Sequence, residues 1–278
     1  PDSAVCNEAV KLAKRHKFAQ LSGFVNGVLR NIARNIDSVQ FDTLSIRYSM
    51  PQWIVDRFVA AYGEKKAEEI FKAFHNKSTI SIRTNLTRCT PDELRAMLEA
   101  EGVTVTAVDE LNYAFVISGF DYLNGLQSFR DGLFYVQDIS SMLVAQTAAP
   151  KKGDYVIDVC AAPGGKSTHI AELLQGSGHV LARDLTDNKV DMIEENIERH
   201  GLNNMSAEVW DATVPDADSA GKADILICDL PCSGLGVLGR KKDIRYKMTP
   251  ESVDELAALQ RQILDTVHTY VKPNGVLV

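Results

Sequence analysis

The chain has 278 residues, of which 45% are hydrophobic and 24% are charged, and its formal net charge is −7. This composition provides enough apolar side chains for a substantial core, and no run of eighteen uncharged apolar residues is present that could span a membrane. The sequence opens without an apolar leader and its five cysteines show no repeated spacing, so we expect a cytoplasmic protein with reduced thiols, no disulfide framework and no metal site.

The charge is distributed unevenly along the chain. Residues 1–90 carry 14 Lys and Arg against 8 Asp and Glu, whereas residues 91–278 carry 16 against 29. A basic cluster interrupts the acidic part, formed by Arg240, Lys241, Lys242, Arg245 and Lys247. Basic runs are often solvated loops, but the release of counterions from phosphates would give this cluster affinity for a nucleic acid.

The first 75 residues have the pattern of a helical region. Apolar residues recur at helical spacing on one face, namely Phe24, Val28, Ile32 and Ile36. Arg30 and Arg34 lie on another face of this helix, and the pattern breaks near Asp37. Residues 49–75 predict two further helices, separated at Gly63.

A small α+β unit is predicted over residues 76–120. Its strands are expected at 79–86, 103–108 and 113–117, which are rich in residues that favour strands. Between the first two strands, Thr90 and Glu93 have the spacing of a capping box, and Gly102 ends the helix that they begin.

From residue 134 onward, strand-like and helix-like segments alternate. The strands are predicted at 155–159, 179–183, 205–210, 223–228 and 275–278, with helices at 166–175, 187–200 and 251–270 between them. This alternation predicts an α/β fold with a doubly wound, Rossmann-like parallel sheet. Ligands of such sheets gather at the carboxyl ends of the strands.

The first of these strands leads into a glycine turn, Asp158-Val159-Cys160-Ala161-Ala162-Pro163-Gly164-Gly165-Lys166, which opens directly into a helix. A strand, a glycine turn and a helix start let the backbone approach a nucleotide-like ligand closely. Residues 165–168 look like the end of a triphosphate-binding P-loop, but that motif requires a glycine where Cys160 stands. We therefore do not predict a triphosphate site.

Acidic residues follow successive strands of the predicted sheet. Asp184 and Asp211 come after the second and third strands, and Asp229 follows the fourth in Asp-Leu-Pro-Cys-Ser-Gly. Carboxylates can accept hydrogen bonds from the two hydroxyls of a ribose and from an adenine amine. Asp is also common as a turn cap after strands, so each of these residues alone would be uninformative. Together with the glycine turn, they predict a site for an adenosine-type cofactor.

These motifs resemble those of the NOL/Sun family of RNA 5-methylcytosine methyltransferases, and within it the bacterial small-subunit ribosomal RNA type often called Fmu or Sun. The segments that carry the resemblance lie along most of the chain, at residues 47–49, 134–141, 158–168 and 229–236. The combination of Ala-Ala-Pro-Gly-Gly-Lys with Asp-Leu-Pro-Cys-Ser-Gly is highly specific for this family.

The resemblance implies that the chain binds S-adenosylmethionine. The residues that would hold it are Cys160, Ala161, Ala162, Pro163, Gly164, Gly165 and Lys166 of the glycine turn, together with Asp184, Asp211 and Asp229. Asp184 would hold the ribose and Asp211 would lie by the adenine. Asp229 would sit between the cofactor and the target cytosine as a catalytic residue.

The resemblance also implies the chemistry. Carbon 5 of cytosine is a weak nucleophile, so a thiolate adds to the neighbouring ring carbon and the resulting enamine-like base attacks the sulfonium methyl group. In this family one cysteine attacks and a second, in the Pro-Cys motif, assists release. Cys232 matches the second, although a thiol behind a proline can also be merely structural. The attacking cysteine is expected beyond Val278, so we expect a fragment of a longer enzyme that does not methylate RNA by itself.

The same resemblance suggests four regions. They are a remnant of a NusB-like helical domain (1–38), a helical linker (39–75), a small α+β RNA-binding subdomain (76–133) and the methyltransferase domain (134–278), whose sheet would be incomplete at its C-terminal edge. The expected partner is ribosomal RNA, bound by a monomer. Its expected contacts are Arg30, Arg34, Arg240, Lys241, Lys242 and Arg245.

Two alternatives to this function stay open. A non-catalytic RNA-binding module could keep the methyltransferase scaffold, and the sequence that follows Val278 would decide between the two. An amino-directed methyltransferase would place an aromatic residue after the strand-end acid, to stack on the target base. Cys232 and Ser233 stand there instead, which disfavours that class.

Overall fold

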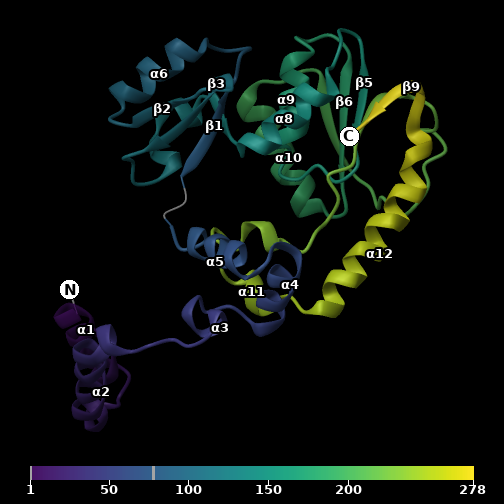
Figure 1. Cartoon of the computed structure of the whole chain (residues 1–278). Coiled ribbons are helices and arrows are strands. Elements are labelled where there is room, and N and C mark those ends of the chain that lie inside the picture. The colour runs from purple at the N-terminus through teal and green to yellow at the C-terminus, as the bar shows by residue number, and fades with distance from the viewer. Residues whose placement is uncertain (1, 77–78) are drawn as a thin grey trace. The chain divides into compact units, whose positions relative to one another are not determined.

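The computed structural model describes residues 2–76 and 79–278, which form two compact units, Pro1–Phe74 and His75–Val278 (Figure 1). The first unit is helical, and both sheets belong to the second. No helix in the described part of the chain combines the length and apolarity that a membrane span needs.

The first unit begins with a hairpin of two helices, α1 (Asp2–Arg15) and α2 (Ser22–Asn35) (Figure 1). The prediction of a helix through Phe24 and Ile32 is confirmed, but both side chains are exposed, Phe24 by 71%. Within α1 only Cys6 is buried, and no residue of α2 is. Each helix of this hairpin has little besides the other to pack against, so most of its apolar face stays in solvent.

The other α-helices in the described part of this unit are α3 (Leu44–Arg47), α4 (Gln52–Tyr62) and α5 (Glu64–Ala73). Gly63 separates α4 from α5 with a φ of +77°, a conformation that glycine adopts without strain. The ring centroids of Phe58 and Phe71 lie 5.3 Å apart across the two helices, and Phe71 is fully buried. The two helices predicted over residues 49–75 are therefore confirmed.

The second unit begins with a small antiparallel sheet of four strands, β1 (Ile80–Thr84), β2 (Thr104–Val108), β3 (Leu111–Ser118) and β4 (Phe134–Val136), in the order β2-β3-β1-β4. Helix α6 (Pro91–Ala100) packs on it through Leu94 and Leu98. The predicted capping box is present, because Thr90 accepts a hydrogen bond from the Glu93 backbone and the Glu93 side chain accepts one from Thr90.

Strand β4 of this sheet lies just after residue 133, where the small subdomain was predicted to end and the methyltransferase domain to begin. Thr84 of β1 pairs with Phe134 of β4, and Ile82 pairs with Val136. Phe134 is fully buried in the core beneath α6. Residues 134–136 therefore pack with the small sheet, and the chain enters the larger layer through α8 (Ile139–Ala148), which follows α7 (Gln127–Arg130) and β4.

The larger sheet is parallel and has five strands, β5 (Tyr155–Asp158), β6 (His179–Asp184), β7 (Met205–Val209), β8 (Ala223–Ile227) and β9 (Val271–Leu277). Their order is β7-β6-β5-β8-β9, so the direction of winding reverses at β5. The predicted doubly wound sheet is confirmed. Its last strand begins at Val271, four residues before the predicted start.

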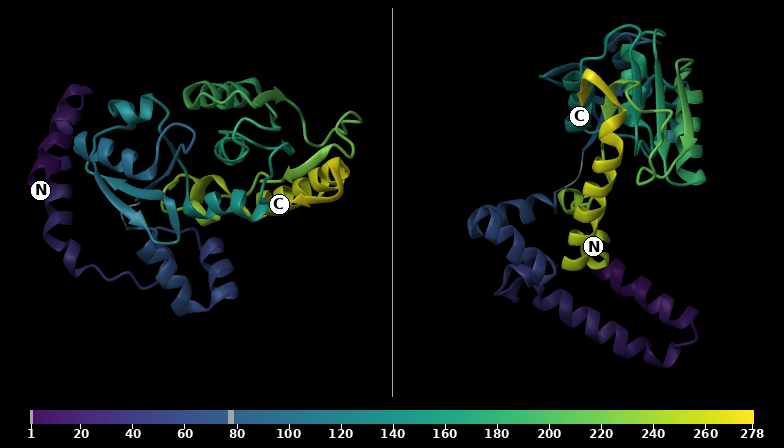
Figure 2. Two further views of the ribbon diagram at one scale, coloured as in Figure 1. Left: turned by 90° about the horizontal axis from the view of Figure 1, so that it is seen from above. Right: turned by 90° about the vertical axis from the view of Figure 1, so that its right-hand side faces the viewer.

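Helices cover both faces of this sheet (Figures 1 and 2). On one face α8, α9 (Gly165–Leu173) and α10 (Asp187–His200) bury a core that includes Ala145, Ile170 and Ile193. On the other face α12 (Pro250–Val267) contributes Ile263 and Val267, while the short α11 (Ile244–Lys247) precedes it. A sheet buried on both sides leaves the ends of its strands as the places where a ligand can enter.

Candidate cofactor and catalytic site

The glycine turn joins the carboxyl end of β5 to the first residue of α9, as predicted. Asp158 ends the strand and is buried, and its carboxylate accepts hydrogen bonds from the Ser167 hydroxyl at 2.5 Å and from the Cys160 backbone N–H at 3.4 Å. Gly164 has a φ of +100°, and a Cβ on Gly165 would lie 3.1 Å from the Tyr135 ring. The backbone angle at position 164 therefore favours glycine, and a side chain at position 165 would crowd the Tyr135 ring.

Burial changes the acidity of Asp158. Loss of solvation raises the pKa of its carboxyl to about 6, although the hydrogen bonds from Ser167 and Cys160 and the nearby Lys166 act in the opposite direction. The folded state therefore holds this proton more tightly than the unfolded chain does.

This shift predicts a pH dependence of stability. Because the pKa of Asp158 rises from 3.8 in the unfolded chain to about 6 in the fold, its protonated form stabilises the fold below pH 4, and that contribution is lost as the pH rises to 6. Asp158→Asn should remove up to about 3 kcal/mol of this dependence. Urea unfolding of both proteins at pH 4 and pH 7 tests it, and parallel profiles would contradict the assignment.

Two adjoining cavities open at the carboxyl ends of the strands, around the glycine turn. The first, of about 170 Å³, is walled by the turn and by Tyr135, Gln137, Asp138 and Ser141. The second cavity, of about 220 Å³, is walled by residues at or just after the ends of β6, β7 and β8 and by residues of α12. They are Asp184, Leu185, Lys189, Trp210, Asp211, Ala212, Thr213, Pro231, Leu259 and Ile263. Both cavities are lined by Cys160, Ala162 and Asp229, so they lie next to each other.

The three carboxylates predicted to converge all line the second cavity. Asp184 is buried and accepts hydrogen bonds from the backbone N–H groups of Ala162 and Leu185, at 2.9 and 2.8 Å, and from the Lys189 ammonium at 2.8 Å. Asp184 thus ties the glycine turn to the end of the neighbouring strand. Asp229 lies where the two cavities join, and its carboxylate pairs with the Lys166 ammonium at 2.5 Å.

Asp211 also caps its own turn, which is the alternative that the sequence left open. Its carboxylate accepts hydrogen bonds from the backbone N–H and hydroxyl of Thr213, at 2.9 and 2.7 Å. The Thr213 hydroxyl and backbone N–H hold the pKa of this exposed carboxyl below its ordinary value. Capping and ligand binding are compatible here, because a carboxylate has lone pairs for several donors.

Several wall residues were not singled out from the sequence. The segment that carried the family resemblance without an assigned role contains Tyr135, Gln137 and Ser141, and Lys189 is the third residue of α10. Trp210, noted only as the neighbour of Asp211, is held by Arg183, whose guanidinium lies 4.9 Å from the indole ring. Nothing in their local spacing distinguishes these residues, because their roles depend on contacts between distant segments.

The cysteines of the site differ in exposure. Cys160 and Cys228 are half-buried, and burial raises the pKa of each thiol to about 12. Cys232 is exposed and does not line either cavity, although Pro231 beside it lines the second. The Pro231 carbonyl accepts a hydrogen bond of 2.7 Å from the Gln260 amide, which ties this loop to α12.

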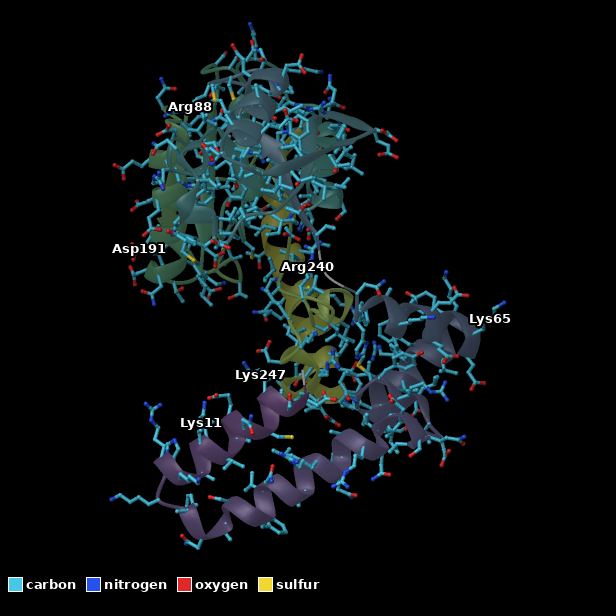
Figure 3. All side chains as sticks on the ribbon, turned by 90° about the vertical axis from the view of Figure 1, so that its left-hand side faces the viewer. Lys11, Lys65, Arg88, Asp191, Arg240 and Lys247 are labelled. Carbon is cyan, nitrogen blue, oxygen red and sulfur yellow. The ribbon has the colours of Figure 1, made fainter. Side chains whose placement is uncertain are left out.

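The residues predicted to contact RNA fall into three groups. Lys241 and Lys242 are exposed, as are Arg30 and Arg34 on α2. Arg240, labelled in Figure 3, pairs with Asp138 at the rim of the first cavity. Arg245 is buried, at 4% exposure, and donates to the Leu238 carbonyl oxygen at 3.4 Å. The expectation of an RNA contact from Arg245 does not fit this placement, because a buried guanidinium cannot reach a phosphate.

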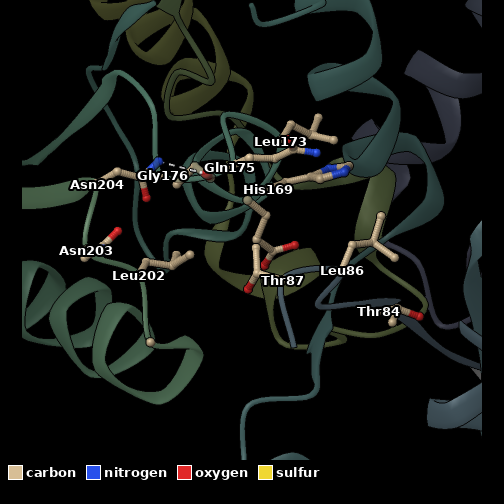
Figure 4. A pocket seen from close by; sticks show the side chains of 13 residues that line it. Thr84, Leu86, Thr87, His169, Leu173, Gln175, Gly176, Leu202, Asn203 and Asn204 are labelled. Carbon is tan, nitrogen blue, oxygen red and sulfur yellow. Dashed lines mark hydrogen bonds between the residues drawn. The ribbon is translucent and has the colours of Figure 1, made fainter. Parts of the chain in front are cut away.

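A further cavity, of about 400 Å³, lies away from the carboxyl ends of the parallel strands, and Figure 4 shows the residues that line it. It is lined by the C-terminal part of α9 and by the loops after β1 and α10, including Leu86, Glu172 and Asn203. Burial lowers the pKa of His169 in its wall to about 2, so this imidazole is neutral. Among the residues that the structure describes, no three His, Cys, Asp or Glu side chains gather closely enough to hold a metal ion.

A doubly wound parallel sheet with a glycine turn after its central strand and carboxylates after the flanking strands defines a protein of the methyltransferase class. A methyltransferase homologue from Pyrococcus horikoshii aligns with a TM-score of 0.70 and 25% identity, over 84% of this chain and 73% of its own. The structure of PH0851 aligns with a TM-score of 0.81 and 26% identity, over 93% of this chain and 60% of its own.

The C-terminal part of the chain is similar to the RsmB/F family of 16S rRNA methyltransferases. The match to that family covers residues 145–278. Two further families match earlier parts of the chain, the ferredoxin-like domain of RsmF/B-like methyltransferases at residues 50–120 and the NusB family at residues 1–34. The probable ribosomal RNA small subunit methyltransferase B of Bacillus subtilis is 37% identical over the whole of this chain, which spans 64% of its length. Ribosomal RNA small subunit methyltransferase B of Proteus mirabilis is 33% identical, and the chain spans 66% of its length.

Proposed function

We propose that the enzyme carrying this chain transfers a methyl group from S-adenosylmethionine to carbon 5 of a cytosine in small-subunit ribosomal RNA. The observation that carries the proposal is the single cavity lined by Asp184, Asp211 and Asp229 beside the glycine turn. The names of the curated relatives support ribosomal RNA as the substrate.

The proposed cofactor residues are those of the glycine turn and the first two carboxylates. Bound S-adenosylmethionine would supply an electrophilic methyl group. Asp184 would accept hydrogen bonds from the ribose hydroxyls, Asp211 would accept one from the adenine amine, and Trp210 and Leu259 would form the apolar walls. Gly164 and Gly165 would let the backbone approach the cofactor without obstruction by a Cβ atom.

Two further residues would act on the target base. Asp229, at the junction of the cavities, would hydrogen-bond the cytosine ring and hold it against the methyl donor. Cys232 would assist the release of the base after a different cysteine has added to it. Cys160 and Cys228 do not suit that attacking role, because burial raises the pKa of both thiols to about 12 and leaves little thiolate at neutral pH. The family resemblance places the attacking cysteine after β9.

The proposal is tested with the enzyme that carries this chain, by methyl transfer from labelled S-adenosylmethionine to small-subunit ribosomal RNA, with the modified base identified by mass spectrometry of the nucleosides. We expect 5-methylcytosine. Asp229→Ala should reduce turnover by about a hundredfold or more. Cys232→Ser should accumulate a protein–RNA adduct that survives denaturing electrophoresis, because the base adds but is not released. Methylation of an exocyclic amine, or turnover unchanged in Asp229→Ala, would refute the assignment.

The alternative, an RNA-binding module on a methyltransferase scaffold, predicts a different result. Such a module would retain RNA through Lys241, Lys242 and the arginines of α2 but would neither bind S-adenosylmethionine nor form an adduct. Calorimetric titration of the protein with S-adenosylmethionine separates the two functions.

A further inference from the structure

Arg83 connects the small sheet to the glycine turn. It lies on β1 and is fully buried, and its guanidinium donates hydrogen bonds to the Gly165 carbonyl oxygen at 2.9 Å and to the Gln137 side chain. Gly165 and Gln137 both line the first cavity. The same guanidinium donates to the Thr168 hydroxyl at 3.2 Å and to the Glu172 carboxylate at 2.8 Å, both on α9. One side chain thus reaches the turn, the helix that follows it and the cavity wall.

The charge of Arg83 is compensated inside the protein. The side chains of Arg83 and Glu172 are 1% and 3% exposed, so neither ion of this pair is solvated. His200 Nδ1 lies 3.5 Å from the same carboxylate. A buried pair of this kind contributes little net stability, because the loss of hydration offsets the attraction. The pairing of charges therefore does not by itself account for a guanidinium at this buried position.

The shape of the guanidinium accounts for its presence there. Its planar fork donates in two directions at once, with Nη1 toward Gly165 and Gln137 and Nη2 toward the side of α9. A lysine ammonium carries its three donors on one nitrogen, so it lacks the two separated nitrogens with which Arg83 reaches both groups of acceptors. Lys166, which pairs with Asp229, directly follows the anchored Gly165.

We infer that Arg83 is a positioning residue for the cofactor, acting through the Gly165 carbonyl and the Gln137 side chain. The inference rests on the proposed use of the cavity for S-adenosylmethionine. It gives the small sheet a role in the cofactor site besides its expected RNA binding, because β1 holds in place the turn against which the cofactor is expected to lie.

The test must separate positioning from mere stability. Arg83→Met alone leaves Glu172 charged and unpaired, which should destabilise the fold. The double variant Arg83→Met with Glu172→Met removes both charges and should recover most of that stability. We expect it to bind S-adenosylmethionine about tenfold more weakly than the unaltered protein, since one charge-assisted hydrogen bond no longer holds the turn.

Arg83→Lys provides a second variant that keeps the ion with Glu172, and we expect the same loss of affinity from it. The matched control is Arg88→Met, because Arg88 bonds to the carbonyl oxygens of His200 and Asp131 but does not contact the glycine turn. This variant should bind the cofactor normally.

Amide hydrogen exchange of residues 160–167, measured without cofactor, gives a readout that does not depend on the proposed function. We expect faster exchange there in the double variant and in Arg83→Lys, and unchanged exchange in Arg88→Met. Unaltered affinity and exchange in both Arg83 variants would overturn the inference. A protein that shows the exchange difference but binds no S-adenosylmethionine would refute the proposed function and leave the anchoring of the turn confirmed.

Discussion

Replacement of Asp184 by alanine is expected to weaken the binding of S-adenosylmethionine by about a hundredfold, equivalent to about 3 kcal/mol. The buried carboxylate holds the Ala162 N–H of the glycine turn and the Lys189 ammonium, so its removal loosens the turn and leaves donors unpaired. It would also remove the proposed acceptor of the ribose hydroxyls. Isothermal calorimetry with the two proteins measures the change directly.

The matched control for this experiment is Asp187→Ala. Asp187 lies three residues further on, in the first turn of α10, and it is exposed and lines neither cavity. Its loss should change cofactor affinity by less than about twofold, because an exposed charge near a helix end acts weakly on its surroundings. Equal effects of the two substitutions would show that Asp184 has no special place in the site.

The largest effect on stability is expected from Gly132→Ala. Gly132 has a φ of +64°, and a Cβ built on it would lie 1.9 Å from the Arg199 carbonyl oxygen of α10. Relief requires the turn before β4 to move away from α10, although the Gly132 carbonyl oxygen also accepts a hydrogen bond from Asn85 at 2.9 Å. We expect a loss of about 3 to 5 kcal/mol in the free energy of unfolding.

Gly153→Ala separates the two causes of this loss. Gly153 has a φ of +91°, but a Cβ there would meet nothing within 4 Å. Its substitution should cost only the backbone term, about 1 to 2 kcal/mol. Urea unfolding followed by the fluorescence of Trp210, in a Trp53→Phe background, compares the two variants. Similar costs for both would contradict the close contact between the turn and α10.

Local sequence signals were sufficient for the elements of the fold and for part of the site. The capping box at Thr90 and Glu93, the break at Gly63 and the glycine turn after β5 depend on residues within a few positions of each other. Alternation of strands and helices then predicts a parallel sheet, because a right-handed crossover leaves few other arrangements. The carboxyl ends of such strands share one edge, so the meeting of Asp184, Asp211 and Asp229 could also be predicted.

The features that could not be predicted from the sequence concern the placement of single side chains. Arg245 belongs to a basic cluster like its neighbours, yet it is buried, and Arg240 pairs with Asp138 instead of standing free. Charge spacing identifies a cluster but does not tell which of its members the fold turns inward. The same limit applies to Phe24. Its spacing from the other apolar residues correctly predicts a helix, but it does not tell that the Phe24 side chain is exposed.

The sequence by itself determined the order of the elements, the position of the glycine turn and the acids at the strand ends, because neighbouring residues encode each of these. Only the tertiary structure decided that β4 joins the small sheet and that Arg83 reaches Glu172, 89 residues away, while anchoring Gly165. The physical reason is that a buried ion selects its partners by geometry across the whole unit. No local pattern records which distant carboxylate and carbonyl oxygen will meet it.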